Sequence, residues 1–143
     1  MASHTNFSRA TPTFALVSLL LCTVFCYSVA EGNCSTTCNV ELCGTMGIKY
    51  GKYCGIDYWG CAGEKPCDDA DACCMGHDEC VGKFGMSHVK CHIRLRNCLT
   101  RVQKSGKVGF SKDCPITSAV STMIRGMDMA ILLSQLGEAV PGI

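Results

Sequence analysis

Residues 50–80, YGKYCGIDYWGCAGEKPCDDADACCMGHDEC, are the stretch that decides how this chain is expected to fold. The first part is rich in glycine and cysteine, and glycine permits close backbone approach and left-handed dihedral angles. The second part predicts a helix that begins near residues 66–69, where a proline precedes Asp68 and Asp69, either of which can cap it. His77 and Asp78 follow on this helix. The stretch therefore predicts a loop leading into a helix that carries a base beside a carboxylate.

Adjacent side chains on a helix point about 100° apart, so His77 and Asp78 can flank one pocket. A hard cation such as calcium prefers oxygen ligands, which Asp78 and the loop carbonyls can supply. His77 could then take a proton from water while the cation holds the oxyanion that forms. A single His-Asp pair is a weak sign, because such pairs are more often solvated or capping. The loop upstream makes the hydrolytic reading the stronger one.

The ordered residues around this pair resemble secretory phospholipase A2 of the plant-type, low-molecular-weight kind. The matching motifs are Y-G-x-Y-C-G at residues 50–55 and D-x-C-C-x-x-H-D-x-C at residues 71–80. The resemblance implies an all-α, small disulfide-rich fold: two antiparallel helices cross-linked by disulfides, a calcium-binding loop and a C-terminal helix. It also implies calcium-dependent hydrolysis of the sn-2 acyl ester of glycerophospholipids, which releases a lysophospholipid and a free fatty acid.

The same resemblance implies a role for individual residues. His77 is similar to the general base that activates water, and the backbone N–H of Gly55 is expected to stabilise the oxyanion. Animal enzymes have a compact glycine run where this chain has residues 56–60. The third loop carbonyl is therefore assigned to Tyr58, with Asp57 as the alternative. The implied calcium ligands are the side chain of Asp78 and the carbonyls of Tyr53, Gly55 and Tyr58.

Two positions depart from the animal pattern. An aspartate that orients the catalytic histidine is replaced by His92, and a supporting tyrosine is replaced by Val81. His92 could hydrogen-bond to His77, directly or through water, or it could merely fill space. The departures keep open a non-catalytic calcium- and lipid-binding protein of the same fold. A third reading, a cysteine-stapled defence peptide without a site, leaves the loop and the His-Asp pair unexplained.

The first thirty residues predict a cleaved signal peptide. Residues 14–26 are a short apolar run, and Ser28-Val29-Ala30 offers the small residues that a signal peptidase requires. Residues 31–143 are then expected to form one phospholipase A2-like catalytic domain. The chain has no ER-retrieval motif at its end, so we expect a secreted protein.

Cysteine number and spacing predict a disulfide framework. Of 14 cysteines, Cys22 and Cys26 leave with the signal peptide, and the remaining even set is typical of an oxidising compartment and argues against zinc. Pairs seven residues apart on two antiparallel helices predict two bridges between the helices. These are Cys80–Cys91 and Cys73–Cys98. The phospholipase resemblance implies Cys54–Cys74 and, from plant-type members, Cys34–Cys61, Cys38–Cys67 and Cys43–Cys114.

The remaining segments give coarser predictions. The cysteine spacing in residues 31–49 is compatible with a turn or two of helix, and a second long helix is expected over residues 87–102. The third helix follows Pro115, with Thr117 or Ser118 as its cap. Its apolar stripe is expected to pack in the core, and lipid contact is the alternative. The stripe contains Val120, Met123, Ile124, Met127, Met129, Ile131, Leu132, Leu133 and Leu136, and the first helix should bury Ala70, Cys73, Cys74, His77, Val81 and Phe84.

Charge and surface aromatics bear on the partners. The formal net charge is +1, and no basic-aromatic platform appears, so nucleic acid is not an expected partner. Residues 83–112 hold eight basic residues and no acid, which reads as a solvated face or as a contact with anionic headgroups. Tyr58 and Trp59 could anchor in a lipid headgroup layer, with core burial the alternative for Trp59. We expect a monomer that meets membrane phospholipid at the lipid–water interface.

Overall fold

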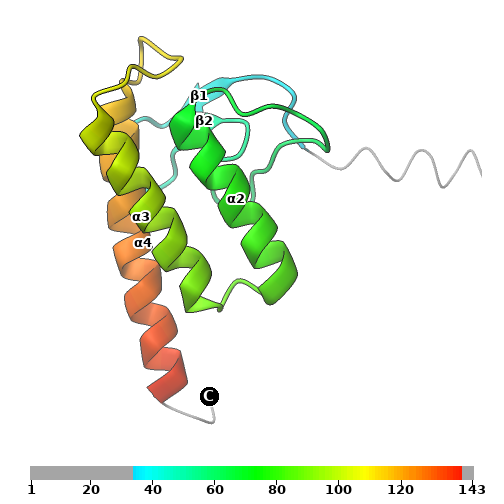
Figure 1. The fold of residues 1–143 in the computed structure, drawn as a ribbon, viewed down its shortest axis with the longest axis vertical. Coiled ribbons are helices and arrows are strands. Elements are labelled where there is room, and N and C mark those ends of the chain that lie inside the picture. Colours follow the sequence, from blue (N-terminus) through cyan, green and yellow to red (C-terminus); the bar gives the residue numbers. More distant parts are fainter. Residues whose placement is uncertain (1–33, 140–143) are drawn as a thin grey trace, which may run out of the picture. The chain divides into compact units, whose positions relative to one another are not determined.

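Three helices carry the part of the chain that the structure describes, and the first two form the antiparallel pair that the sequence predicts (Figure 1). The computed structural model describes residues 34–139. Helix α2 spans Asp69–Phe84, α3 spans Val89–Ser105 and α4 spans Ile116–Ala139. The predicted signal peptide, residues 1–30, lies outside the described residues. From Cys34 onward the chain forms one compact unit.

Helix α2 begins and ends at residues suited to those positions. The Asp68 carboxylate accepts hydrogen bonds from the N–H groups of Ala70 and Asp71, both at 3.0 Å, so Asp68 rather than Asp69 is the cap. Gly85, with φ 89°, ends the helix and donates its N–H to the Val81 carbonyl. Of the two glycines near this end, Gly82 lies inside the helix and only Gly85 ends it.

Six disulfides hold the described part of the chain together, and they join the partners expected from spacing and resemblance. Two of them cross-link α2 and α3, and one fastens the loop to α2. Each bridge of this kind contributes about 2–4 kcal/mol, which matters in a domain with few large apolar residues in its core. The bridges are Cys73–Cys98, Cys80–Cys91, Cys54–Cys74, Cys34–Cys61, Cys38–Cys67 and Cys43–Cys114.

The prediction of helix in the N-terminal segment is wrong for its described part. Residues 39–51 instead form an antiparallel hairpin of β1 (Asn39–Glu41) and β2 (Lys49–Gly51), with Val40 opposite Tyr50. The cysteines of this segment bond to three different regions of the fold, at Cys61, Cys67 and Cys114. An extended segment can reach all three, whereas one short helix face cannot.

Helix α4 lies antiparallel to α3, but only its first half belongs to the core. Buried Val120 and Met123 pack with Leu99 of α3, whereas Leu132 and Leu133 are exposed. The predicted continuous core stripe is therefore wrong beyond the middle of α4. The helix also begins at Ile116, one or two residues before the predicted caps.

The inward face predicted for α2 is likewise correct only in part. Ala70, Cys73 and Cys74 are buried, whereas Phe84 is 53% exposed. Phe84 is the last residue of α2, where the helix has passed the end of the core. The fold thus places the middle of α2 between the loop and α3, which is where the predicted site residues lie.

Candidate active site

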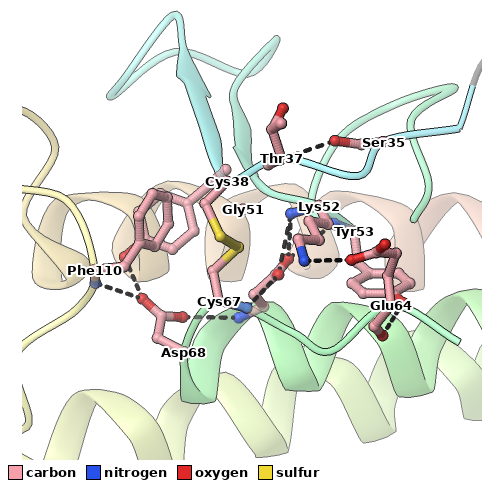
Figure 2. Close-up of a disulfide and its surroundings, with 12 residues drawn as sticks. Ser35, Thr37, Cys38, Gly51, Lys52, Tyr53, Glu64, Cys67, Asp68 and Phe110 are labelled. Carbon is pink, nitrogen blue, oxygen red and sulfur yellow. Dashed lines mark hydrogen bonds and ion pairs between the residues drawn. A yellow bond between two sulfur atoms is a disulfide. The ribbon is translucent and has the colours of Figure 1, made fainter. Parts of the chain in front are cut away.

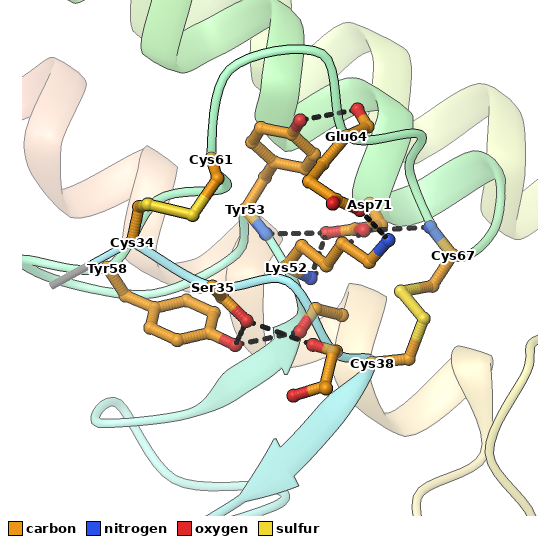
Figure 3. Close-up of polar contacts among 12 residues, drawn as sticks. Cys34, Ser35, Cys38, Lys52, Tyr53, Tyr58, Cys61, Glu64, Cys67 and Asp71 are labelled. Carbon is orange, nitrogen blue, oxygen red and sulfur yellow. Dashed lines mark hydrogen bonds and ion pairs between the residues drawn. A yellow bond between two sulfur atoms is a disulfide. The ribbon is translucent and has the colours of Figure 1, made fainter. Parts of the chain in front are cut away.

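A buried carboxylate on α2 holds the loop in place. Asp71 has no exposed surface, and its two oxygens accept hydrogen bonds from the backbone N–H groups of Lys52 (3.0 Å), Tyr53 (2.8 Å) and Cys67 (2.9 Å) (Figure 3). Gly51, with φ +73°, passes so close that a Cβ there would lie 2.2 Å from Asp71 Cγ. Asp71 therefore fixes the backbone of the loop against α2, a role that the sequence motif alone does not reveal.

The cap residue Asp68 ties two further segments to the start of α2. Its Oδ2 accepts a hydrogen bond from the Tyr50 hydroxyl at 2.6 Å and from the Phe110 N–H at 3.2 Å (Figure 2). Burial, and next the bond to Asp68, raise the pKa of Tyr50, which stays a neutral donor. The Cys38–Cys67 bridge lies beside these contacts (Figure 2). The loop, the hairpin and the segment before α4 thus all converge on one helix end.

Side chains along the loop are also engaged in contacts within the protein. The Tyr58 hydroxyl lies 2.9 Å from both the Gly51 carbonyl and Ser35 Oγ (Figure 3). Because its hydroxyl is hydrogen-bonded inside the protein, Tyr58 is only partly exposed and not the fully exposed ring that the sequence suggested. Trp59 is 45% exposed, so the alternative of core burial is wrong for this residue.

Several loop carbonyls remain available. Among the described residues, the carbonyls of Gly51, Cys54 and Trp59 accept hydrogen bonds, whereas those of Tyr53 and of residues 55–58 accept none. Asp57 has a left-handed φ of 51°, which turns the chain within this run. The three carbonyls expected to bind calcium are therefore among the free ones.

Asp78 presents an oxygen without a partner. Its Oδ2 is buried and, within residues 34–139, makes no hydrogen bond, while its Oδ1 lies 3.9 Å from His77 Nδ1. Burial raises the pKa of Asp78, and the neighbouring His77 opposes this shift when it is protonated. A buried carboxylate oxygen without a donor costs free energy unless a cation or a proton meets it.

A chain of hydrogen bonds fixes the tautomer of His77. His92 is 4% exposed; its Nε2 lies 2.7 Å from the Met86 carbonyl and its Nδ1 lies 3.0 Å from His77 Nε2. Because a carbonyl can only accept, His92 Nε2 carries the proton, and the Nδ1 of a neutral His92 accepts. His77 Nε2 then donates, which leaves His77 Nδ1 with a free lone pair on the side of Asp78. The direct bond replaces the space-filling alternative for His92.

The predicted site residues line two separate cavities. Tyr53 and Asp78 line one of about 490 Å³ together with Trp59, and His77 lines another of about 260 Å³ between α2 and α3. Gly55 and Tyr58 are not among the described residues that line the first. The structure thus places Asp78 and Tyr53 in the same cavity. His77 does not line that cavity, but its Nδ1 lies 3.9 Å from Asp78 Oδ1.

The described residues limit what kind of metal centre can form here. No group of three His, Cys, Asp or Glu side chains that could hold a metal is found within residues 34–139. A metal ion at Asp78 would therefore take most of its protein ligands from main-chain oxygens. That donor chemistry suits a hard cation such as calcium.

Comparison with known proteins identifies the relatives of this chain. Models of known protein families give no match. Probable phospholipase A2 homolog 1 of Oryza sativa subsp. japonica is 57% identical over 104 residues, which cover 73% of this chain and 75% of that protein. Phospholipase A2-beta of Arabidopsis thaliana is 44% identical over 145 residues, covering 96% of each chain.

A solved structure agrees with these relatives. The solved structure of Oryza sativa (rice) PLA2 in complex with octanoic acid superimposes with a TM-score of 0.69 at 33% identity, covering 76% of this chain and 96% of that one. Fold, motifs and relatives therefore agree, and the chain belongs to the plant-type family of secretory phospholipases A2, enzymes that hydrolyse phospholipids.

Proposed function

We propose that this protein hydrolyses the sn-2 ester of glycerophospholipids in a calcium-dependent reaction, with His77 as the general base. One observation carries the proposal: Asp78, whose Oδ2 has no hydrogen-bond partner among the described residues, lies 3.9 Å from Nδ1 of His77, and the bond from His77 Nε2 to His92 is consistent with a lone pair on that Nδ1. Proton abstraction needs such a lone pair, and a bound cation needs such an oxygen.

The residues fit calcium. Asp78 and the carbonyls of Tyr53, Gly55 and Tyr58 would hold the ion. Asp71 fixes the loop at Lys52 and Tyr53, and the three carbonyls accept no hydrogen bond among the described residues. When bound, calcium would polarise the ester carbonyl and offset the negative charge that develops in the transition state. Disulfide-bonded cysteines offer no thiolates, which disfavours softer metals.

The protein's own groups supply the proton transfer. His77 Nδ1 takes a proton from a water molecule, and that water attacks the ester carbon. The proton then passes from the imidazolium to the departing lysophospholipid oxygen, so His77 ends the cycle neutral. The N–H of Gly55 is suited to donate to the oxyanion, because the described hydrogen bonds leave it free.

His92 is proposed to act through His77 rather than on the substrate. Its bond to the Met86 carbonyl sets its own tautomer, and its Nδ1 then holds His77 with the lone pair on the Asp78 side. This arrangement supplies the orientation that an aspartate supplies in animal enzymes. It also answers the main argument for the non-catalytic, calcium- and lipid-binding reading.

The proposed setting is the secretory route, with membrane phospholipid as substrate. Six disulfides among the described residues are consistent with an oxidising, extracellular location. The rice relative was solved with octanoic acid, and a fatty acid is one product of the proposed reaction. The predicted signal peptide, residues 1–30, agrees with this setting.

The test is fatty acid release from phospholipid vesicles labelled at the sn-2 position, with calcium and then with a chelator. Wild type should release the label only with calcium, and His77→Asn should release it about a thousandfold more slowly. Undiminished release under chelation, or release within tenfold of wild type in His77→Asn, contradicts the proposal. Calcium binding without release supports the non-catalytic protein instead.

A further inference from the structure

The smaller of the two cavities lies between α2 and α3, and we call it the α2–α3 groove. It has a volume of about 260 Å³, and among the described residues it shares no lining residue with the cavity that contains Asp78 and Tyr53. The Cys73–Cys98 disulfide, which joins the two helices, is part of its lining, and so is a flank of His77. The groove is therefore a hollow separate from the predicted calcium site.

The wall that α2 contributes to the α2–α3 groove is small and uncharged. Ala72 and Gly76 line it. A Cβ added at Gly76 would meet no heavy atom within 4 Å beyond the adjoining helix backbone. Glycine inside a helix is destabilising relative to alanine, and at this position it leaves open space beside α2.

The wall that α3 contributes is basic. Arg94 and Arg101 line it, with Asn97 between them. Asn97 and Arg101 follow Arg94 by three and seven residues, which places all three on one face of the helix. Two arginines with this spacing have Cα atoms about 10.5 Å apart. Within residues 34–139, none of the three side chains forms a hydrogen bond or an ion pair, so their donors are free for a ligand.

The two cavities carry opposite charge. The cavity at Asp78 is lined by three acidic side chains and, among the described residues, by no basic one. The described lining of the α2–α3 groove contains two arginines and no acid. Acids close to its α2 wall in the sequence are engaged elsewhere, because Asp69 pairs with Lys107 and Asp71 accepts hydrogen bonds from the loop. A cleft lined by one sign of charge concentrates ions of the other sign, so the groove attracts anions.

The rest of α3 adds to this attraction. Lys90 lies four residues before Arg94, and Lys104 lies three residues after Arg101, so the same face of the helix is basic along its length. Helix α3 contains no acidic residue between Val89 and Ser105. Both lysines are exposed, and no acid of α3 offsets the positive potential at the groove.

We propose that the α2–α3 groove binds a phosphate group. A guanidinium keeps its charge and presents a planar fork of donors that matches phosphate oxygens, and Asn97 adds a neutral donor. A phosphate monoester carries about two negative charges at neutral pH, which two arginines balance, whereas a carboxylate would leave one of them unmatched. The inference does not rest on the proposed hydrolysis, because neither arginine is assigned a part in that reaction.

NMR titration of the mature protein in the presence of a chelator tests the site without turnover. Inorganic phosphate should shift the backbone amide signals of residues 72–77 and 94–101, whereas sodium chloride at the same ionic strength should not. Dihexanoyl phosphatidic acid, dispersed as monomers, is the second probe, because its headgroup is a phosphate monoester. Tighter binding of inorganic phosphate supports free phosphate as the ligand, and tighter binding of phosphatidic acid supports a lipid headgroup.

Removal of the two arginine charges tests which residues bind the phosphate. Arg94→Gln with Arg101→Gln should weaken the binding of both probes by roughly tenfold or more, because charge-assisted hydrogen bonds are lost. Lys65→Gln with Lys112→Gln is the matched control, since it removes the same charge from exposed residues outside the groove. Screening by salt should keep the affinity of this control within about twofold of wild type.

A change of shape without a change of charge provides the second test. Gly76→Leu should fill the open space and prevent binding of either probe. Gly82→Leu is its control, because Gly82 also lies on α2 with no atom near an added Cβ, but outside the groove. Leucine favours helix more than glycine does, so both variants should fold. The proposal is overturned if phosphate shifts no amide signal of the groove, if the arginine variant and its control bind equally, or if the two leucine variants do.

Discussion

Two carboxylates on α2 lie two turns apart and have opposite surroundings. Asp71 is fully buried and accepts hydrogen bonds from three backbone N–H groups of the loop and its end. Asp78 has a buried oxygen that accepts none among the described residues. The difference shows that Asp71 holds the loop against α2, whereas Asp78 keeps a buried oxygen that no described donor meets.

The largest effect is expected at the Asp78 end of this comparison, in His77→Asn. Asparagine is close in size but has no basic nitrogen, so hydrolysis should fall by about three orders of magnitude. Fatty acid release from vesicles measures the loss, and a thermal melt checks that the fold is retained. Activity within tenfold of wild type would remove His77 from the mechanism.

Substitution of Asp71 should lower the free energy of unfolding. Asp71→Asn replaces a charged acceptor by an amide whose NH2 group faces backbone donors, which should cost about 3 kcal/mol of unfolding free energy. Guanidinium denaturation with the disulfides intact measures this loss. Asp69→Asn is the matched control, because Asp69 is exposed and, among residues 34–139, pairs with Lys107 alone, so it should cost at most about 1 kcal/mol. Equal losses in the two variants would refute the loop-building role.

A smaller effect is expected at His92, which is proposed to orient His77 through a hydrogen bond. His92→Leu should lower kcat by about 10- to 100-fold with little change in KM, because it removes the acceptor that orients His77. His92→Asp restores an acceptor and should recover most of the activity. If leucine and aspartate variants are equally impaired, His92 only fills space.

Much of the fold was predictable because it follows from the spacing of cysteines and from the order of motifs in the sequence. Cysteines seven apart on two helices define the bridges Cys73–Cys98 and Cys80–Cys91, and the motif order identifies the loop and His77 with Asp78. These features depend on periodicity within an element. They can be predicted without knowing which other segment packs against that element.

The features that the sequence did not predict depend on which segment of the same chain packs against which other segment. The apolar stripe of α4 continues to Leu136, but α3 has 17 residues against 24 in α4, so the stripe outlasts its partner and becomes exposed. The hairpin depends on the disulfide partners of Cys38 and Cys43, which are Cys67 and Cys114. The acceptor for His92 is the backbone carbonyl of Met86, which no side-chain pattern reveals.

Calorimetric titration of calcium into the metal-free mature protein tests the central claim most directly, namely that Asp78 and the loop carbonyls hold the ion beside His77. We predict one binding site in wild type, retention of that site in His77→Asn and its loss in Asp78→Asn. Equal calcium binding by wild type and Asp78→Asn would contradict the account.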